Sequence, residues 1–268
     1  MFRLPMAFLK RDFLTSVSYR LSFAMQIGGM AISVLVFFFI SKLFGAAARP
    51  MLQEYGGDYF SFVLGGIAFS GYLGVGLNSF SQSIGREQSL GTLEAMLVTP
   101  TGIAAMVLSM SLWSFALTSV NVVLYLMLGA LAFGVNLQGA NVPCALVTQM
   151  LTIVCFASLG IMSAAFIMVV KRGDPINWLF GGLSALLGGV YYPVQVLPKS
   201  LLALSYCLPV TYALRAIRLS VLRGYGFADL RFELGMLAAF TAVCLPLSIA
   251  AFRVAVKRAK SDGSLAHY

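Results

Sequence analysis

The sequence predicts an all-α integral membrane protein that crosses the bilayer six times. Hydrophobic residues make up 60% of its 268 residues and charged residues only 10%, and the charges leave long stretches free. A soluble domain carries about 25% charged residues, because its surface must be hydrated. The net charge of +9 therefore does not indicate a nucleic-acid-binding protein or a soluble enzyme, since the chain has too little polar surface for either.

Stretches without charge locate the spans, because a charged side chain at the bilayer centre costs about 2.5 to 3.5 kcal/mol or more. A helix needs about 20 residues to cross. The charge-free stretch 95–170 is therefore long enough for two helices, which turn residues between Gly134 and Pro143 separate, whereas 200–214 is too short for one. The expected spans are about 21–44, 59–84, 103–132, 144–170, 175–197 and 234–253.

The distribution of Lys and Arg predicts the orientation. With the N-terminus inside, eleven of these residues lie on the inner side and seven on the outer side, and cytoplasmic loops carry the excess. Both termini are thus expected in the cytoplasm, at the inner membrane. Residues 5–20 have apolar side chains at helical spacing and predict an interfacial helix; the alternative is a frayed cytoplasmic extension.

The sequence lacks the residue patterns of a catalytic or metal centre. It contains no H-E-x-x-H, no G-x-S-x-G, no paired cysteine motif and no Walker A motif, and its single histidine is His267. The predicted spans also lack carboxylates, which argues against an ion-coupled carrier. No catalytic or metal-binding residues and no cofactor are predicted, and energy for any uphill transport would come from a partner.

The stretch from Gly85 to Pro100, between the second and third expected spans, reads as a short cytoplasmic amphipathic helix over about 91–99. Thr92 can cap it, Glu94 lies in its first turn, and three apolar side chains share one face. Such a knob fits a groove on a soluble protein; the alternative is a lipid-facing turn. The candidate coupling residues are Arg86, Glu87, Gly91, Thr92, Leu93, Glu94, Met96, Leu97, Thr99 and Pro100.

With its pattern R-E…G-T-L-E-x-M-L-V-T-P, this stretch resembles the coupling helix of ABC-2 type transporter permeases, including the daunorubicin-resistance and Nod-factor export permeases. A second likeness covers Tyr192-Pro193, Leu197-Pro198, Leu208-Pro209 and Thr211 to Arg218, which is similar to an external re-entrant hairpin of that family. The hairpin would occupy about 198–225, and residues 1–268 would form one transmembrane domain.

The resemblance implies that the chain works in a complex with other chains. It implies a second permease copy, expected as a homodimer, and two copies of a separate ABC ATPase that bind ATP and Mg²⁺. The permease would then catalyse nothing itself, would bind no nucleic acid and would export a hydrophobic or amphipathic substrate such as a drug, a lipid or a lipid-linked glycan. The alternatives are a non-transporting membrane scaffold or assembly protein and an ion-coupled carrier.

Several residues have two interpretations. Gly66, Ser70, Gly74 and Asn78 form a small and polar stripe that either packs closely or lines the path. Glycines at 181, 182, 188 and 189 indicate close packing or a bend. Tyr191 and Tyr192 predict an aromatic belt or a gate. The external basic residues Arg215, Arg218 and Arg223 would meet an anionic head group or extend to lipid.

Overall fold

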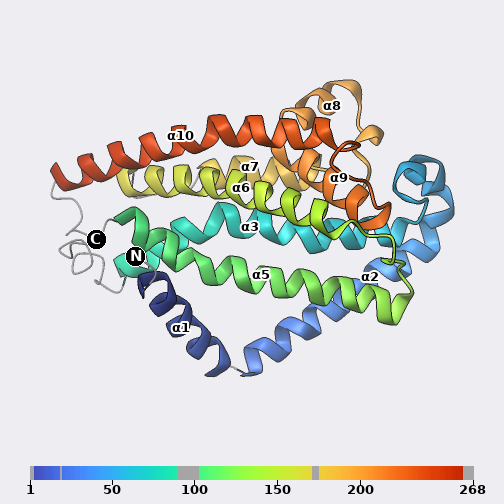
Figure 1. The fold of residues 1–268 in the computed structure, drawn as a ribbon, viewed down its shortest axis with the longest axis horizontal. Helices are drawn as coiled ribbons and strands as arrows, with labels where there is room; N and C mark the ends of the chain where they lie inside the picture. Colours follow the sequence, from blue (N-terminus) through green and yellow to red (C-terminus); the bar gives the residue numbers. More distant parts are fainter. Residues whose placement is uncertain (1–2, 19, 90–102, 171–174, 262–268) are drawn as a thin grey trace.

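The protein is a bundle of long helices, as the computed structural model shows for residues 3–18, 20–89, 103–170 and 175–261 (Figure 1). Among these described residues, five helical segments are long and apolar enough to cross a membrane, and a bent helix pair adds a sixth candidate. The prediction of an all-α membrane protein is therefore confirmed. The five segments are Phe23–Tyr55, Tyr59–Ser83, Ser111–Phe133, Val142–Val170 and Arg231–Arg258.

The first two helices, α1 (Arg3–Ser18) and α2 (Arg20–Ala48), form a V at one edge of the bundle. The Phe13 ring of α1 packs edge-on against Trp113, with ring centroids 5.8 Å apart. The chain then turns through the 3₁₀ helix η1 (Arg49–Tyr55). Thus α1 covers residues 5–18 of the predicted interfacial segment 5–20 and lies against the bundle.

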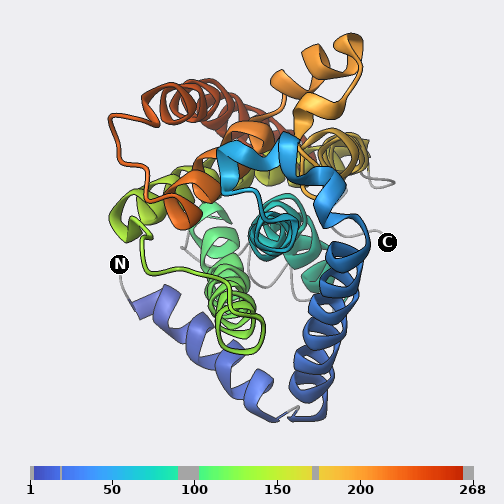
Figure 2. The same cartoon turned by 90° about the vertical axis from the view of Figure 1, so that its right-hand side faces the viewer.

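Helix α3 (Tyr59–Ser89) lies at the centre, and Figure 2 shows it end-on with other helices around it. Helices α5 (Ile103–Phe133) and α6 (Val142–Val170) both pack on it, and α10 (Arg231–Ser261) packs on α6. A Cβ added at Gly160 would lie 1.9 Å from the Gly76 carbonyl oxygen. Two glycines therefore allow the close approach of α3 and α6.

The fifth expected span, 175–197, is wrong as a continuous helix. Helix α7 (Pro175–Leu187) has 13 residues, which is about 20 Å at 1.5 Å per residue and short of a bilayer core of about 30 Å. Irregular chain and the short η2 (Val194–Val196) follow. Helices α8 (Lys199–Tyr206) and α9 (Pro209–Leu222) come next, bent by 83°, within the expected re-entrant segment.

The bundle has two distinct ends (Figure 1). Helix α1 begins and α10 ends at one of them, which we call the termini end. The last turn of α3 and the first turn of α5 lie at this same end. The opposite end, which we call the η1 end, holds η1, α8 and α9.

Candidate functional site

The predicted coupling segment is bracketed by two helices of known position. Arg86 and Glu87 lie in the last turn of α3, whereas Gly91, Thr92, Leu93, Glu94, Met96, Leu97, Thr99 and Pro100 lie outside the described residues. Helices α3 and α5 precede and follow the segment in the chain and pack against each other, and the last turn of α3 and the first turn of α5 lie at the termini end (Figure 1). The coupling helix itself stays a prediction.

The end of the α-helical conformation after α7 leaves buried backbone carbonyl groups at the η1 end. Gly188 ends the helical hydrogen bonding, and Gly189 adopts a left-handed conformation with φ of 74°, which favours glycine. The carbonyl groups of Gly189 and Val190 lie beyond the end of α7 and take no part in its helical hydrogen bonding. Each such group costs several kcal/mol in hydrocarbon unless it receives a hydrogen bond.

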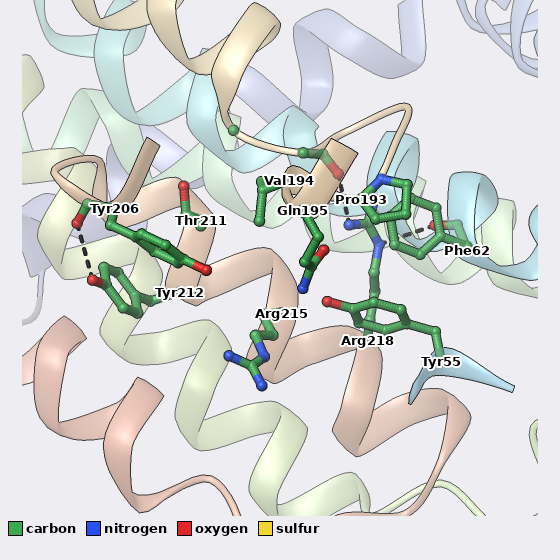
Figure 3. Close-up of a pocket in the computed structure, with 12 residues that line it drawn as sticks. Tyr55, Phe62, Pro193, Val194, Gln195, Tyr206, Thr211, Tyr212, Arg215 and Arg218 are labelled. Carbon is green, nitrogen blue, oxygen red and sulfur yellow. Dashed lines mark hydrogen bonds between the residues drawn. The ribbon is translucent and has the colours of Figure 1, made fainter. Parts of the chain in front are cut away.

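Arg218 of α9 supplies these hydrogen bonds (Figure 3). Its Nη1 donates to the Gly189 carbonyl at 2.7 Å and its Nη2 to the Val190 carbonyl at 2.6 Å. Its Nε donates to the Phe62 carbonyl of α3 at 3.0 Å, and the guanidinium carbon lies 3.6 Å from the centre of the Phe62 ring. We call this set of contacts the arginine clamp; it ties α9 and α3 to the end of α7.

The expectation that Arg218 faces lipid head groups is wrong. Only 3% of the residue is exposed, because its planar fork of donors matches carbonyl groups that the end of α7 leaves open. Gly66 of α3 makes room for it, since a Cβ there would lie 2.1 Å from the Val190 oxygen and 2.2 Å from Arg218 Nη2.

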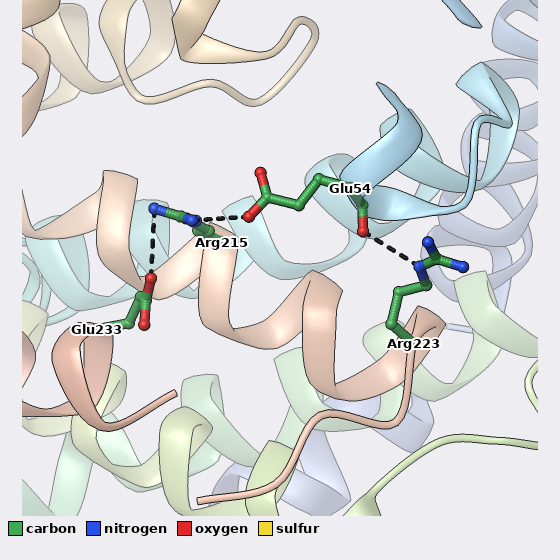
Figure 4. A network of polar contacts seen from close by, with 4 residues as sticks. All are labelled: Glu54, Arg215, Arg223 and Glu233. Carbon is green, nitrogen blue, oxygen red and sulfur yellow. Dashed lines mark hydrogen bonds and ion pairs between the residues drawn. The ribbon is translucent and has the colours of Figure 1, made fainter. Parts of the chain in front are cut away.

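The other two predicted basic residues hold neighbouring elements together (Figure 4). Arg215 forms ion pairs with Glu54 of η1 at 2.7 Å and with Glu233 of α10 at 3.3 Å. Arg223 donates to the backbone carbonyls of Glu54 and Gln53. These contacts join η1, α9 and α10, and a role toward an anionic head group stays a prediction for both arginines.

The bend between α8 and α9 is fixed by side chains near Pro209. Ser205 Oγ donates to the Leu187 carbonyl at the end of α7, and Thr211 Oγ1 donates to the Ser205 carbonyl, both at 2.7 Å. Tyr212 donates to the Tyr206 carbonyl at 2.9 Å (Figure 3). Thr211 and Tyr212 therefore have a structural role in closing the bend.

A cavity of about 20 Å³ lies among Tyr55, Gln195, Tyr212, Arg215 and Arg218 (Figure 3). This volume accommodates about one water molecule. This cavity therefore has no room for a drug or a lipid.

The predicted stripe on α3 divides between the two interpretations. Gly66 packs closely, whereas Gly74 is exposed with no neighbouring atom within 4 Å of an added Cβ. Ser70 donates to the Ile67 carbonyl, and Asn78 donates to the Gly74 carbonyl and accepts from Asn177 of α7. The path assignment of Ser70, Gly74 and Asn78 stays a prediction.

The two predicted gate tyrosines follow the end of α7. The exposed Tyr191 stacks on Phe37 of α2, with ring centroids 5.6 Å apart, and Tyr59 donates to its carbonyl at 3.2 Å. Tyr192 donates to the Leu186 carbonyl. Both tyrosines contact the protein, and neither the gate nor the belt follows from these contacts.

Sequence reasoning missed the partners of the arginines and the α3–α6 contact. Glu54 and Glu233 lie far apart in the sequence, and nothing near them indicates that they share Arg215 as a partner. Gly76 and Gly160 are 84 positions apart and carry no motif. The sequence predicted Arg215, Arg218 and Arg223 as external basic residues, and it did not indicate the burial of Arg218.

These features define a multi-pass helical membrane protein. The carbonyl groups of its irregular segment after α7 receive their hydrogen bonds from Arg218 of the same chain. The model of the ABC-2 type transporter family matches residues 6–222, well over half of the chain. The chain belongs to this family and is a membrane-spanning permease component of an ABC transporter. No curated protein matches it.

Proposed function

We propose that the chain is the permease subunit of an ATP-driven exporter and works with two copies of a separate ABC ATPase. The family match over residues 6–222 carries this proposal. The chain has no Walker A motif of its own, so ATP and Mg²⁺ would bind to the partner subunit. Two permease copies would form the translocation path between them.

The position of α3 and α5 supports force transmission to the spans. Both helices run the length of the bundle, and the end of α3 and the start of α5, between which the predicted coupling segment falls in the sequence, lie at the termini end (Figure 1). A push on that segment would therefore act directly on the central helix α3. This arrangement requires the termini end to face the cytoplasm.

The proposed substrate is hydrophobic or amphipathic. Residues 59–85 and 95–170 carry no charged side chain, and the buried Arg218 is occupied by backbone carbonyls. An ion inside the membrane would find no charged partner on these helices, and burying an unpaired charge is costly. Drugs, lipids and lipid-linked glycans satisfy this requirement.

Transport in reconstituted vesicles tests the proposal. The chain and its ATPase are incorporated together, and export of fluorescent drugs and lipids is followed with ATP, with a non-hydrolysable ATP analogue and with an ion gradient alone. Export that needs ATP hydrolysis supports the exporter. Export driven by the ion gradient would indicate a carrier, and ATPase binding without transport of any probe would indicate a scaffold.

A further inference from the structure

A second, larger cavity lies between α5 and α6, away from the arginine clamp. Its lining includes Phe69 and Tyr72 of α3, Val122 of α5 and Ile153 of α6. Its volume is about 440 Å³, which falls in the range of about 300 to 1,000 Å³ typical of small-molecule sites. We call it the α5–α6 groove.

The mouth of the groove opens on a surface suited to hydrocarbon. Val123, Leu146 and Met150 at the mouth are 54%, 55% and 61% exposed. They belong to α5 and α6, both of which are long and apolar enough to cross a membrane. The molecules next to this opening are therefore lipids and other solutes dissolved in the bilayer.

One polar group in the groove has unmet hydrogen-bonding capacity. Gln149 of α6 lines the groove and is 7% exposed, and within the described ranges neither its Oε1 nor its Nε2 has a hydrogen-bond partner. The nearby Tyr72 hydroxyl is already used, since it donates to Ser119 Oγ at 2.6 Å, and Ser119 donates to the Phe115 carbonyl. An amide left unpaired in apolar surroundings is costly.

We propose that the α5–α6 groove binds a single-chain amphiphile from the bilayer. Its acyl chain fills the apolar groove, and its polar group pairs with the Gln149 amide. Because that amide offers one acceptor and two donors, the matching polar group carries both a donor and an acceptor, as in a secondary amide. The lining residues include no charged side chain, so the polar group is uncharged. The site does not depend on the proposed export activity.

Photolabelling in lipid nanodiscs tests the site. The probe is an N-acyl ethanolamine with a diazirine in its chain, and an alkyl diazirine without a polar group is the reference. Labelling is expected to saturate and to concentrate on Leu146, Met150 and Ile153, as mapped by mass spectrometry. Gln149→Met, which keeps the bulk and removes the amide, is expected to raise the half-saturating concentration of the amide probe about tenfold and to leave the alkyl probe unchanged.

Two substitutions on the exposed surface serve as a matched pair. Val123→Trp at the mouth is expected to reduce labelling by both probes, whereas Val147→Trp, on the exposed face of α6 outside the groove, leaves both unchanged. Non-saturable labelling spread equally over the groove and Val147 would mean annular lipid only and would overturn the proposal. An unchanged response of the amide probe in Gln149→Met would also overturn it, leaving water as the partner of the amide.

Discussion

Arg218 is the residue on which the buried polar contacts of the η1 end converge. Its three donors occupy the carbonyl oxygens of Phe62, Gly189 and Val190. Each buried acceptor that loses its only donor costs about 1 to 3 kcal/mol. The charge of Arg218 therefore matters less than the shape of its guanidinium group, which reaches all three oxygens at once.

Replacing Arg218 with Met is expected to lower the free energy of unfolding by about 2 kcal/mol or more, because the carbonyl groups of Gly189 and Val190 lose their donor. Arg218→Lys keeps the charge but not the planar fork, so an intermediate loss is expected. Thermal unfolding in detergent, followed by tryptophan fluorescence, measures both. Arg231→Met, at an exposed position, is the control, and equal melting temperatures for Arg218→Met and this control would contradict the clamp.

Sequence reasoning identified Arg218 but assigned it the wrong surroundings. An arginine among apolar residues normally extends toward water or lipid head groups, and no acidic partner lies close to it in sequence. Its acceptors are backbone carbonyls 28, 29 and 156 positions away. Backbone acceptors leave no trace in the amino-acid sequence, so this contact becomes visible only in three dimensions.

At the scale of elements, charge-free stretches located the long helices well and failed at α7. The helices α2, α3, α5, α6 and α10 each cover an expected span. A membrane span needs a stretch without charge, but such a stretch is not always one continuous helix. Residues 188–198 are uncharged and mostly irregular. The glycines at 188 and 189 did indicate a bend as one of two interpretations, and the left-handed Gly189 agrees with it.

The close packing of α3 against α6 predicts that a methyl group added at Gly160 destabilises the protein. Gly160→Ala is expected to destabilise the protein by about 1 to 3 kcal/mol, because the new Cβ would meet the Gly76 carbonyl oxygen at 1.9 Å and the helices must separate. The measurement is the melting temperature of the purified protein.

Gly182→Ala is the matched control for this prediction. No atom lies within 4 Å of its added Cβ, and alanine favours a helix over glycine by about 1 kcal/mol. Its melting temperature is expected to stay equal or rise. A Gly160→Ala protein as stable as Gly182→Ala would show that α3 and α6 are farther apart than described.

For the whole molecule, a native cysteine can test the orientation in the membrane. Cys207 is exposed between α8 and α9, at the η1 end. If the termini are cytoplasmic, a membrane-impermeant maleimide is expected to label Cys207 in intact cells and not in Cys207→Ala. A cysteine introduced at the exposed Lys257 near the end of α10 should react only after permeabilisation, and the reverse pattern would invert the topology.

The coupling hypothesis also belongs to the whole assembly. Leu93→Asp and Glu94→Arg are each expected to reduce ATP-dependent export at least tenfold while the permease still inserts. The first removes an apolar contact with the ATPase, and the second reverses a charge that would position the helix on it. Vesicle transport and copurification of the ATPase measure the effect. Leu201→Asp, exposed on α8 at the opposite end, is the control, and normal export in both coupling variants would remove the assignment.

The arginine clamp has a consequence for the order in which the protein matures. During synthesis, α7 emerges from the ribosome before α9. The carbonyls of Gly189 and Val190 are therefore made before Arg218, which donates their hydrogen bonds. Until Arg218 has been synthesised, α7 and the carbonyl groups that follow it cannot enter lipid unless water or the insertion machinery supplies hydrogen-bond donors. The insertion of α7 is therefore completed only together with that of α9, and a nascent chain that stops after α8 should be held at the translocon or degraded.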